Sequence, residues 1–458
     1  MKYNKNTDWL NVGLLVFSVL SFLFGWILLL LALLSTSSAD AATILLTPTN
    51  SIASGIASAA TGDTVLVQAS TRNESIVLNK AVTVKADGLV TLRPGAYRGI
   101  DIQCSNCTVD GFTLENFSQA AATNAGTPRT NVKLLNLKFV NAGAGLWVEG
   151  TGWTVERVTL HFRCRDGEDY CNAFGSGHTF RRLFFYGLVI PGDIGPRADG
   201  TYKHSDIIQS FVAGGMPGIK NSIVEECIFT DFAEGVYFHN EAGTQDAING
   251  NIVRNNVFWG TDFASVAGTN LVGGPVHTTR FTGPSSVPGQ IRNNLYFNAN
   301  LGITLDRVPG VQVEGNIIYA SGAAYALQNM TAGGVNRGTL GNVLWQNNYD
   351  GGVSGAPDKL QNPQLQNPAA VGAAVIGPDG IPWTADDAWR VTNATLAAYG
   401  PQLAAVAPQP PTATDTPTRA EFDALKARVT VLEARPTWTQ QQIVDLAKGV
   451  VTATRLQP

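Results

Sequence analysis

The chain has 458 residues, of which 14% are charged, and its formal net charge is −4 at pH 7. This balance excludes the broad basic face of a nucleic-acid-binding protein, so an anionic substrate would have to meet a local basic cluster. The 48 glycines favour tight, stacked turns over long helices.

The N-terminal segment, residues 1–42, contains an uncharged and almost wholly apolar stretch at residues 12–34. As a helix of about 34 Å, at about 1.5 Å per residue, it would cross a bilayer core. Lys2 and Lys5 precede it, which predicts a cytoplasmic N-terminus and export of the rest of the chain. Residues 39–41 form a small-residue cleavage site. The segment is therefore either a membrane anchor or a cleaved signal peptide, and the protein is expected to be extracellular or at the cell surface.

A short motif recurs between Val109 and Trp345: an apolar or charged residue, one or two polar residues, often Asn, and then a β-branched or aromatic run. The base period of about 21 to 26 residues is typical of a stacked supersecondary unit. The spacing lengthens between Arg182 and Asn294. The third positions of the copies are Gly111, Asn136, Arg157, Arg182, Glu226, Asn256, Asn294, Asn316 and Asn342.

The repeats hold short alternating apolar runs split by Gly, Asn and Asp, without helical periodicity. They lack the fixed Leu positions of a leucine-rich repeat and the roughly 40-residue length of a propeller blade. The pattern predicts an all-β, right-handed parallel β-helix with two or three short strands per coil. One turn position is expected to hold stacked Asn residues, because Asn tolerates a left-handed backbone and its side chain can bond the neighbouring chain. These residues are Asn136, Asn256, Asn294, Asn316 and Asn342.

On this repeat, the chain from about Thr43 to Pro368 resembles the pectate-lyase-like superfamily of β-helix proteins. The resemblance implies the fold, which also carries hydrolases, epimerases, phage spikes and non-catalytic adhesins. With a closing segment, the β-helix domain is expected to occupy residues 43–399. Loops of a solenoid often carry function, and three interrupt the central coils, at residues 164–171, 191–202 and 268–288.

Five cysteines in an exported chain invite disulfides. Cys164 and Cys171 bracket a charged loop and either form a bridge across it or remain free thiols. Cys104 and Cys107 form a CxxC near a turn, which indicates a local bridge or plain packing. Cys227 is predicted to be a buried free thiol in the apolar slot that other coils fill with Val257, Leu295 and Ile317.

The densest polar segment is residues 203–209, and the following coil continues it. Alignment of the two strands stacks Asp206 over Glu234 and Gln209 over Tyr237, on rungs about 4.8 Å apart. These side chains are therefore expected to be near neighbours.

The same strand in other coils places Glu149, His239 and Asp306 in one column. Alternation turns Tyr237 and His239 outward but does not fix the direction of the two stacked carboxylates. If the carboxylates also face outward, one side of the solenoid carries an acidic and aromatic groove. Its members are Glu149, Asp206, Gln209, Glu234, Tyr237, His239 and Asp306.

The segment HSDIIQ resembles an H-S/T-D-G-I-Q element of polysaccharide-acting and phage β-helix proteins, with Ile207 in place of the usual Gly. Paired carboxylates push their pKa values apart, so Asp206 and Glu234 are candidates for the two catalytic groups of glycoside hydrolysis. A lyase or epimerase acting on a uronate needs a cation and a base instead. The cation candidates are Lys203, Arg181 and Arg182, and the base candidates are His204, His239 and Tyr237.

The segment GPDGIPWTADD at residues 377–387 resembles the closing segment of bacterial β-helix domains, with Trp383 where Gly is usual. Carboxylate oxygens suit Ca²⁺, so Asp379, Asp386 and Asp387 either bind calcium or form a polar capping turn. Calcium is the only cofactor candidate that the sequence offers.

Residues 400–418 form a Pro/Thr-rich linker with polyproline character. Beyond it, residues 419–458 keep a short a/d pattern followed by a second amphipathic stretch. This helical tail is expected either to form a homo-oligomer or to dock on the body as a hairpin.

Together these features predict an exported β-helix protein that binds a polysaccharide and cleaves or modifies it, as a lyase, glycosidase or epimerase. The alternative is a non-catalytic surface or virion protein in which the solenoid is a stalk or a receptor-binding body. The membrane is expected as a partner only if the N-terminal segment is retained.

Overall fold

The computed structural model describes residues 22, 41–94, 96–164, 169–189, 195–196, 202–203, 206–212, 215–230, 232, 234–240, 249–260, 277–282, 287–298, 302–306, 308, 310–319, 327–329, 340, 342–345, 359, 361–370, 372–379, 382–384 and 386–401. Contacts group residues 1–42 and residues 43–458 into two units, and the fold below is that of the second. The predicted anchor and the 419–458 tail lie outside the described residues, as does the linker after residue 401. Within the described residues, no helix is long and apolar enough to span a membrane.

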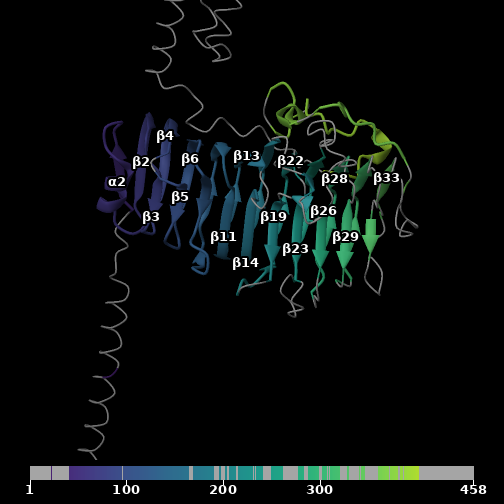
Figure 1. The fold of residues 1–458 in the computed structure, drawn as a ribbon, viewed down its shortest axis with the longest axis horizontal. Coiled ribbons are helices and arrows are strands. Elements are labelled where there is room, and N and C mark those ends of the chain that lie inside the picture. The colour runs from purple at the N-terminus through teal and green to yellow at the C-terminus, as the bar shows by residue number, and fades with distance from the viewer. Residues whose placement is uncertain are drawn as a thin grey trace, which may run out of the picture. The chain divides into compact units, whose positions relative to one another are not determined.

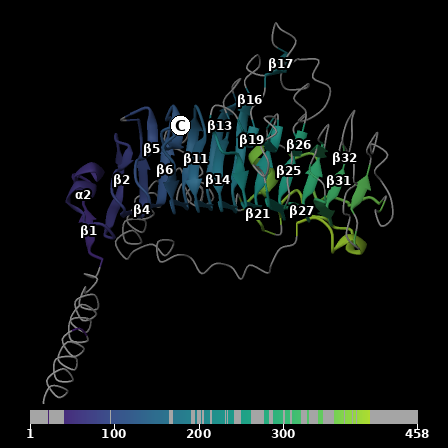
Figure 2. The same ribbon diagram turned by 90° about the horizontal axis from the view of Figure 1, so that it is seen from below.

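The solenoid begins with three long parallel strands, β2 (Thr64–Arg72), β4 (Thr83–Leu92) and β6 (Thr108–Glu115). β1 (Thr43–Leu46) pairs with β2 at the N-terminal edge. After β6, two short strands replace each long one, and both pair with β6 in the first such coil. In Figures 1 and 2 the strands follow one another in chain order from the α2 end of the solenoid.

Three ladders of stacked strands run along the solenoid. The first ladder continues from β6 through β9 (Lys133–Leu135), β12 (Thr154–Glu156), β15 (Thr179–Arg181), β21 (Ile223–Glu225), β24 (Ile252–Arg254), β27 (Gln290–Arg292) and β30 (Gln312–Glu314). The second continues through β10 (Lys138–Ala142), β13 (Thr159–Cys164), β16 (Phe184–Val189), β22 (Ile228–Thr230), β25 (Val257–Trp259), β28 (Leu295–Phe297), β31 (Ile317–Tyr319) and β33 (Val343–Trp345).

The third ladder forms a separate sheet. Its strands are β3 (Ile76–Leu78), β5 (Arg98–Ile102), β7 (Gln119–Ala122), β11 (Leu146–Thr151), β14 (Cys171–Ser176), β19 (Asp206–Phe211), β23 (Glu234–His239), β26 (His277–Thr282), β29 (Ile303–Asp306) and β32 (Leu327–Asn329). The short strands β8 (Arg129–Thr130) and β20 (Ile219–Lys220) pair with β11 and β14. β17 (Gly195–Pro196) and β18 (Tyr202–Lys203) form an antiparallel pair.

Strands within the ladders pair in parallel with their counterparts one coil away. Helical structure among the described residues of this unit is limited to α2 (Ile52–Ser58) and the 3₁₀ turns η1 (Gly372–Ile376) and η2 (Ala394–Leu396). The predicted all-β parallel β-helix is therefore confirmed.

The turn between the first and second ladders needs one residue with a left-handed backbone. This position is held by Asn136 (φ 52°), Arg157 (53°), Arg182 (55°), Glu226 (54°), Asn255 (56°), Asn293 (53°) and Gly315 (70°). Asn and Gly adopt this conformation readily, whereas Arg or Glu does so at a cost on the order of 1 kcal/mol. The prediction of a left-handed Asn is correct for Asn136. For the later coils the left-handed backbone is wrong, because Asn256, Asn294 and Asn316 each follow the left-handed residue by one, whereas the expected stacking of these Asn side chains is confirmed.

Those displaced residues, Asn256, Asn294, Asn316 and Asn342, form a buried asparagine ladder inside the solenoid. The Asn294 carboxamide oxygen accepts hydrogen bonds from the Asn256 backbone N–H at 2.9 Å and from its side-chain nitrogen at 3.0 Å. The Asn294 side-chain nitrogen donates to the Val253 carbonyl at 2.9 Å. Asn316 and Asn342 repeat the pattern, so these buried amides satisfy one another and the backbone.

Cys227 stands at the head of this ladder. Its backbone N–H donates to the Asn256 carboxamide oxygen at 3.0 Å, and it is a fully buried free thiol, as predicted. Because Ile228 pairs with Val257, Cys227 occupies the slot of Asn256 and not that of Val257. The slot prediction is therefore wrong by one residue, for the same reason as the Asn alignment.

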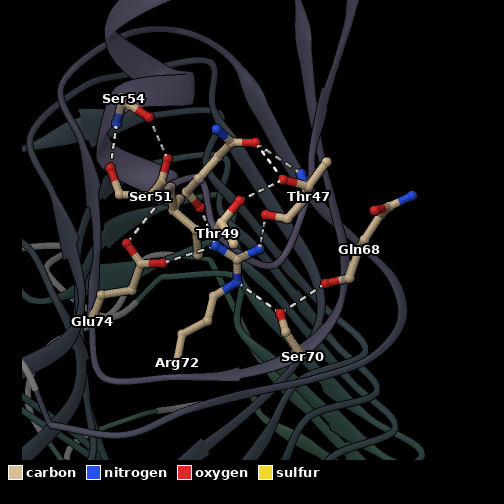
Figure 3. A network of polar contacts seen from close by, with 10 residues as sticks. Thr47, Thr49, Ser51, Ser54, Gln68, Ser70, Arg72 and Glu74 are labelled. Atoms are coloured by element: carbon tan, nitrogen blue, oxygen red, sulfur yellow. Dashed lines mark hydrogen bonds and ion pairs between the residues drawn. The ribbon is translucent and has the colours of Figure 1, made fainter.

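A polar network around Arg72 holds the N-terminal coil together (Figure 3). The guanidinium of this buried residue donates to the Thr47 carbonyl at 2.8 Å, to the Ser70 hydroxyl at 2.8 Å and to the Asn50 carbonyl. It also pairs with Glu74 at 3.3 Å. The Glu74 carboxylate in turn accepts the backbone N–H of Ile52 at 2.9 Å, at the start of α2.

Residues 361–401, here called the closing strap, cover the outer face of the second ladder. Strands of this ladder are apolar on both faces: Phe258 lies in the inner core, whereas Val257 and Trp259 pack outward against the strap. The Trp259 indole N–H donates to the Ala370 carbonyl at 2.8 Å. η1 lies against β16 and β22, and Figure 1 shows the strap as the yellow-green segment along this side. Burial on both faces explains the continuous apolar runs of these strands.

Replacement of Asn294 by Leu is expected to lower the free energy of unfolding by about 2 to 4 kcal/mol, because the buried Asn256 N–H and the Val253 carbonyl lose their partner. Denaturant unfolding measures the change. The matched control is Asn293→Gly, at the adjacent left-handed turn position (φ 53°), which is expected to change stability by less than about 1 kcal/mol. Equal effects of the two substitutions would contradict the ladder's role.

Candidate functional site

The predicted polar segments form two adjacent strands of the third ladder, β19 and β23. Asp206 pairs with Glu234, and Gln209 pairs with Tyr237, so the predicted register is confirmed. The predicted register column through Glu149, His239 and Asp306 is also present. It runs through consecutive strands as Glu149, Phe174, Phe211, His239, Thr282 and Asp306.

Alternate residues of these strands face opposite ways. Val148, Ala173, Ile208 and Val236 are 0% exposed and belong to the inner core. The residues beside them include Trp147, Asn172 and Gln209, which are partly exposed and lie in register with Tyr237. The outer face of the third ladder therefore carries large aromatic rings and amides.

Five rings on this face form a continuous aromatic row. The ring centroids are 5.2 Å apart for Trp147 and Phe174, 4.9 Å for Phe174 and Phe211, 5.9 Å for Phe211 and His239, and 4.4 Å for His239 and Tyr237. These distances are those of favourable ring contacts. Trp147, Phe211 and His239 are partly exposed, whereas Phe174 and Tyr237 lie beneath the surface.

Sequence reasoning identified Tyr237 and His239 but missed Trp147, Phe174, Phe211 and Asn172. The signal available for Phe174 and Phe211 was the alternation of inward and outward residues in the segments CNAFGS and DIIQSF. It could be used only once the correct coil-to-coil register was known, because long insertions separate these strands in the sequence.

Glu149 lies at the β11 end of the column and is only 4% exposed. Its carboxylate accepts hydrogen bonds from the Trp147 indole N–H at 3.1 Å and from the Gly126 backbone N–H at 3.0 Å. Glu149 therefore positions the Trp147 ring and a neighbouring loop, and the expectation that its carboxylate lines an open groove is wrong.

Asp206 is 0% exposed and shares its strand parity with the core residue Ile208. Its backbone N–H donates to the Asp169 carboxylate at 2.9 Å, and its carbonyl accepts the Tyr170 N–H at 2.8 Å. The expectation that Asp206 lines an outer groove is therefore wrong, because the register that pairs it with Glu234 also gives it the inward parity.

Arg181 and Arg182 lie at β15 of the first ladder and not on the third. Arg181 pairs with Glu156 at 2.9 Å, and Arg182 pairs with Glu226 at 2.8 Å. The hydrogen bond from Glu156 raises the pKa of the Arg181 guanidinium. Arg181 belongs to a row of charges on the first ladder and Arg182 lies at the turn that follows it, so neither joins the predicted groove. In strand order that row is Glu156, Arg181, Glu225, Arg254, Arg292 and Glu314.

The remaining predicted residues are placed only in part. Lys203, Glu234 and Asp306 lie in described strands, but their side chains fall outside the described part of the structure, as does His204 altogether. Arg280, which sequence reasoning did not select, pairs with Tyr237 in the neighbouring strand β26.

Of the two alternatives for Cys164 and Cys171, the structure favours free thiols over the bridge. Cys171 is a free thiol, fully buried in β14, where it pairs with Leu146 and packs in the core. Cys164 ends β13 in the second ladder, where it pairs with Val189. The two residues therefore lie in strands of different sheets, and their short spacing in the sequence does not show this.

No family model matches this chain, and no curated protein matches it in sequence. Among solved structures it is similar to the pectate lyase Pel9A, at 13% identity and a TM-score of 0.42, over 81% of this chain and 94% of that one. The PL6-family alginate lyase AlyGC and a variant of it match at 13% identity and a TM-score of 0.39, over 78% of this chain and 56% of theirs. The parallel β-helix itself is shown by the strand pairing of the chain. At this level of identity, the likeness concerns the fold alone.

The three predicted calcium ligands lie in the closing strap. The Asp386 carboxylate accepts hydrogen bonds from the Thr384 hydroxyl at 2.7 Å and from the Asp379 backbone N–H at 3.3 Å. The Thr384 bond lowers the pKa of Asp386. Among the described residues, no three His, Cys, Asp or Glu side chains are grouped so as to hold a metal ion. Calcium binding by Asp379, Asp386 and Asp387 stays a prediction without this geometric support.

Asp387 is 0% exposed, and among the described residues neither of its carboxylate oxygens has a partner that meets the geometry of a hydrogen bond. Burial raises the pKa of Asp387 from 3.8 to about 7, although the nearby Trp383 and Thr384 backbone N–H groups and the Arg390 guanidinium oppose this shift and Asp379 adds to it. Its contribution to stability is therefore full below pH 4 and is lost as the pH rises towards 7.

Replacement of Asp387 by Asn is expected to stabilise the protein relative to the parent by about 2 to 4 kcal/mol more at pH 8 than at pH 4, because the variant has no carboxyl to ionise. Denaturant unfolding at several pH values measures this difference. Asp379→Asn, at an exposed position of the same strap, is the control and is expected to show no comparable trend. A pH-independent difference for Asp387→Asn would contradict the assignment.

Proposed function

We propose that this protein binds a polysaccharide along the outer face of the third ladder and modifies it there. The observation that carries the proposal is the aromatic row of Trp147, Phe174, Phe211, His239 and Tyr237. Aromatic rings offer flat apolar surfaces to the apolar faces of sugar rings, and neighbouring amides bond sugar hydroxyls. Asn172 and Gln209 supply such amides in register with the row.

The other outer faces favour this choice. The described part of the first ladder pairs its charges with one another, and the closing strap covers the second ladder. The third ladder combines partly exposed rings with polar groups across several rungs. Rungs about 4.8 Å apart form an extended surface, which suits a linear chain of sugars better than a compact small molecule.

The chemistry favoured is elimination or epimerisation at a uronate. Hydrolysis by paired carboxylates needs both groups beside the sugar, and Asp206 is buried. A uronate reaction needs a base and a cation. His204, His239 and Tyr237 stay base candidates from the sequence; the His239 ring is partly exposed, although its two nitrogens and Tyr237 are buried. Arg280, paired with Tyr237, joins Lys203 as a candidate cation.

Glu234 stays a candidate acid or base at the start of β23. Export through the N-terminal segment also belongs to this proposal, because it would bring the protein to polysaccharides outside the cell. The non-catalytic alternative shares the binding surface but predicts no change in the bound polysaccharide.

Replacement of Trp147 or Phe211 by Ala is expected to weaken polysaccharide binding at least tenfold, or about 1.4 kcal/mol, because each removes a partly exposed ring from the row. Calorimetry or affinity electrophoresis with a panel of acidic and neutral polysaccharides measures the loss. Tyr186→Ala removes a ring from the second ladder and is expected to leave binding unchanged. The proposal fails if no polysaccharide binds, or if all three variants bind like the parent.

The reaction type is tested on the same panel. Elimination creates a carbon–carbon double bond conjugated to the uronate carboxyl, which absorbs in the ultraviolet, whereas hydrolysis releases reducing ends without it. The expected result is an ultraviolet-absorbing product or an epimerised polymer, lost in His239→Gln. Release of saturated oligosaccharides would contradict this chemistry, and binding without any product would support the non-catalytic alternative.

A further inference from the structure

A pair of cysteines lies away from the aromatic row, in the turn between β5 and β6. Cys104 and Cys107 are both free thiols. Asn106 between them has a left-handed backbone (φ 57°), and its N–H donates to the Thr130 carbonyl of the next coil at 2.8 Å. The Ser105 hydroxyl accepts the Thr130 N–H at 2.9 Å. The neighbouring coil therefore fixes the shape of the CxxC turn.

The two thiols have different surroundings. Cys104 is partly exposed, and its Sγ donates to the Lys80 carbonyl at 2.9 Å. Cys107 is 1% exposed, and its Sγ donates to the Cys104 carbonyl at 3.3 Å. One cysteine is thus partly exposed while the other is enclosed in the same turn, as in a pair of attacking and resolving cysteines.

The pKa values of the two thiols also differ, and the more exposed Cys104 has the lower one. The neighbouring Cys107 thiol lowers the pKa of Cys104, and the positive charge of Arg129 adds to this effect. The neighbouring Cys104 thiol and burial raise the pKa of Cys107. Burial raises the pKa of Cys171 and Cys227, which are fully enclosed. Among the four thiols described, Cys104 is the one suited to form a thiolate that solvent can reach.

We propose that Cys104 and Cys107 form a redox-active dithiol that low-molecular-weight organic disulfides oxidise. The Cys104 thiolate attacks one sulfur of the disulfide, whose S–S bond breaks, and one thiolate leaves and takes up a proton. Cys107 then gives its proton to solvent and attacks the Cys104 sulfur, which releases the second thiol. The protein loses two electrons and two protons, and the organic disulfide becomes two thiols.

Oxidation alters the local structure. The Cys104 bond to the Lys80 carbonyl and the Cys107 bond to the Cys104 carbonyl both lose their donor hydrogens. The Cys104–Cys107 disulfide then cross-links the turn between β5 and β6. The site couples the redox state of the surroundings to the first coils of the solenoid, independently of polysaccharide binding.

The test uses the reduced full chain and oxidised glutathione, followed by peptide mapping of the alkylated protein. The expected product is a Cys104–Cys107 disulfide, formed at least tenfold faster than any modification of Cys171 or Cys227. Cys107→Ser is expected to stop at a mixed disulfide on Cys104, and Cys104→Ser is expected to leave position 107 unmodified.

Two results would overturn the proposal. One is a folded protein in which Cys104 reacts no faster than Cys171 and Cys227. The other is a Cys107→Ser variant that accumulates no glutathione on Cys104 while the parent also forms no Cys104–Cys107 disulfide. The parent measurement needs no substitution, so the test holds even if a variant does not fold.

Discussion

The in-register stacking of parallel coils is the constraint on which the rest of this structure depends. Each strand must bond its counterpart one coil away, so residues at equivalent positions form columns about 4.8 Å apart. Such a column is stable only if the side chains stacked along it make favourable contacts with one another. The asparagine ladder from Asn256 to Asn342 meets this condition with amides that bond each other. The first ladder meets it largely with alternating charges, from Glu156 to Glu314.

The same constraint made much of the fold predictable. Period, alternation and turn residues are local signals, and they were sufficient to predict a parallel β-helix and the pairing of Asp206 with Glu234. They were insufficient where two positions look alike in sequence. In the pair Asn255-Asn256, only the backbone shows that the first residue is left-handed and the second is buried. Packing between distant parts of the chain could not be predicted either, because nothing near Trp259 in the sequence indicates that the Ala370 carbonyl accepts a hydrogen bond from its indole N–H.

The candidate site was predictable in its location more than in its chemistry. Tyr237 and His239 were found because alternation fixes outward positions within one strand. Asp206 was misjudged because its direction was left open at the strand's entry, although it alternates with the core residue Ile208 and faces inward like it. Trp147 and Phe211 were missed because the rings of the aromatic row come from four coils that are far apart in the sequence. The outer face of the third ladder is thus defined by aromatic rings from distant segments, with carboxylates such as Glu149 in supporting positions.

A crystal structure of the full chain with a bound acidic oligosaccharide would test the central claim most directly. Our account predicts sugar rings that cross the third ladder from strand to strand, packed against Trp147 and Phe211 and hydrogen-bonded to Asn172 or Gln209. An oligosaccharide bound instead on the charged first ladder or on the closing strap, with the aromatic row empty, would contradict it.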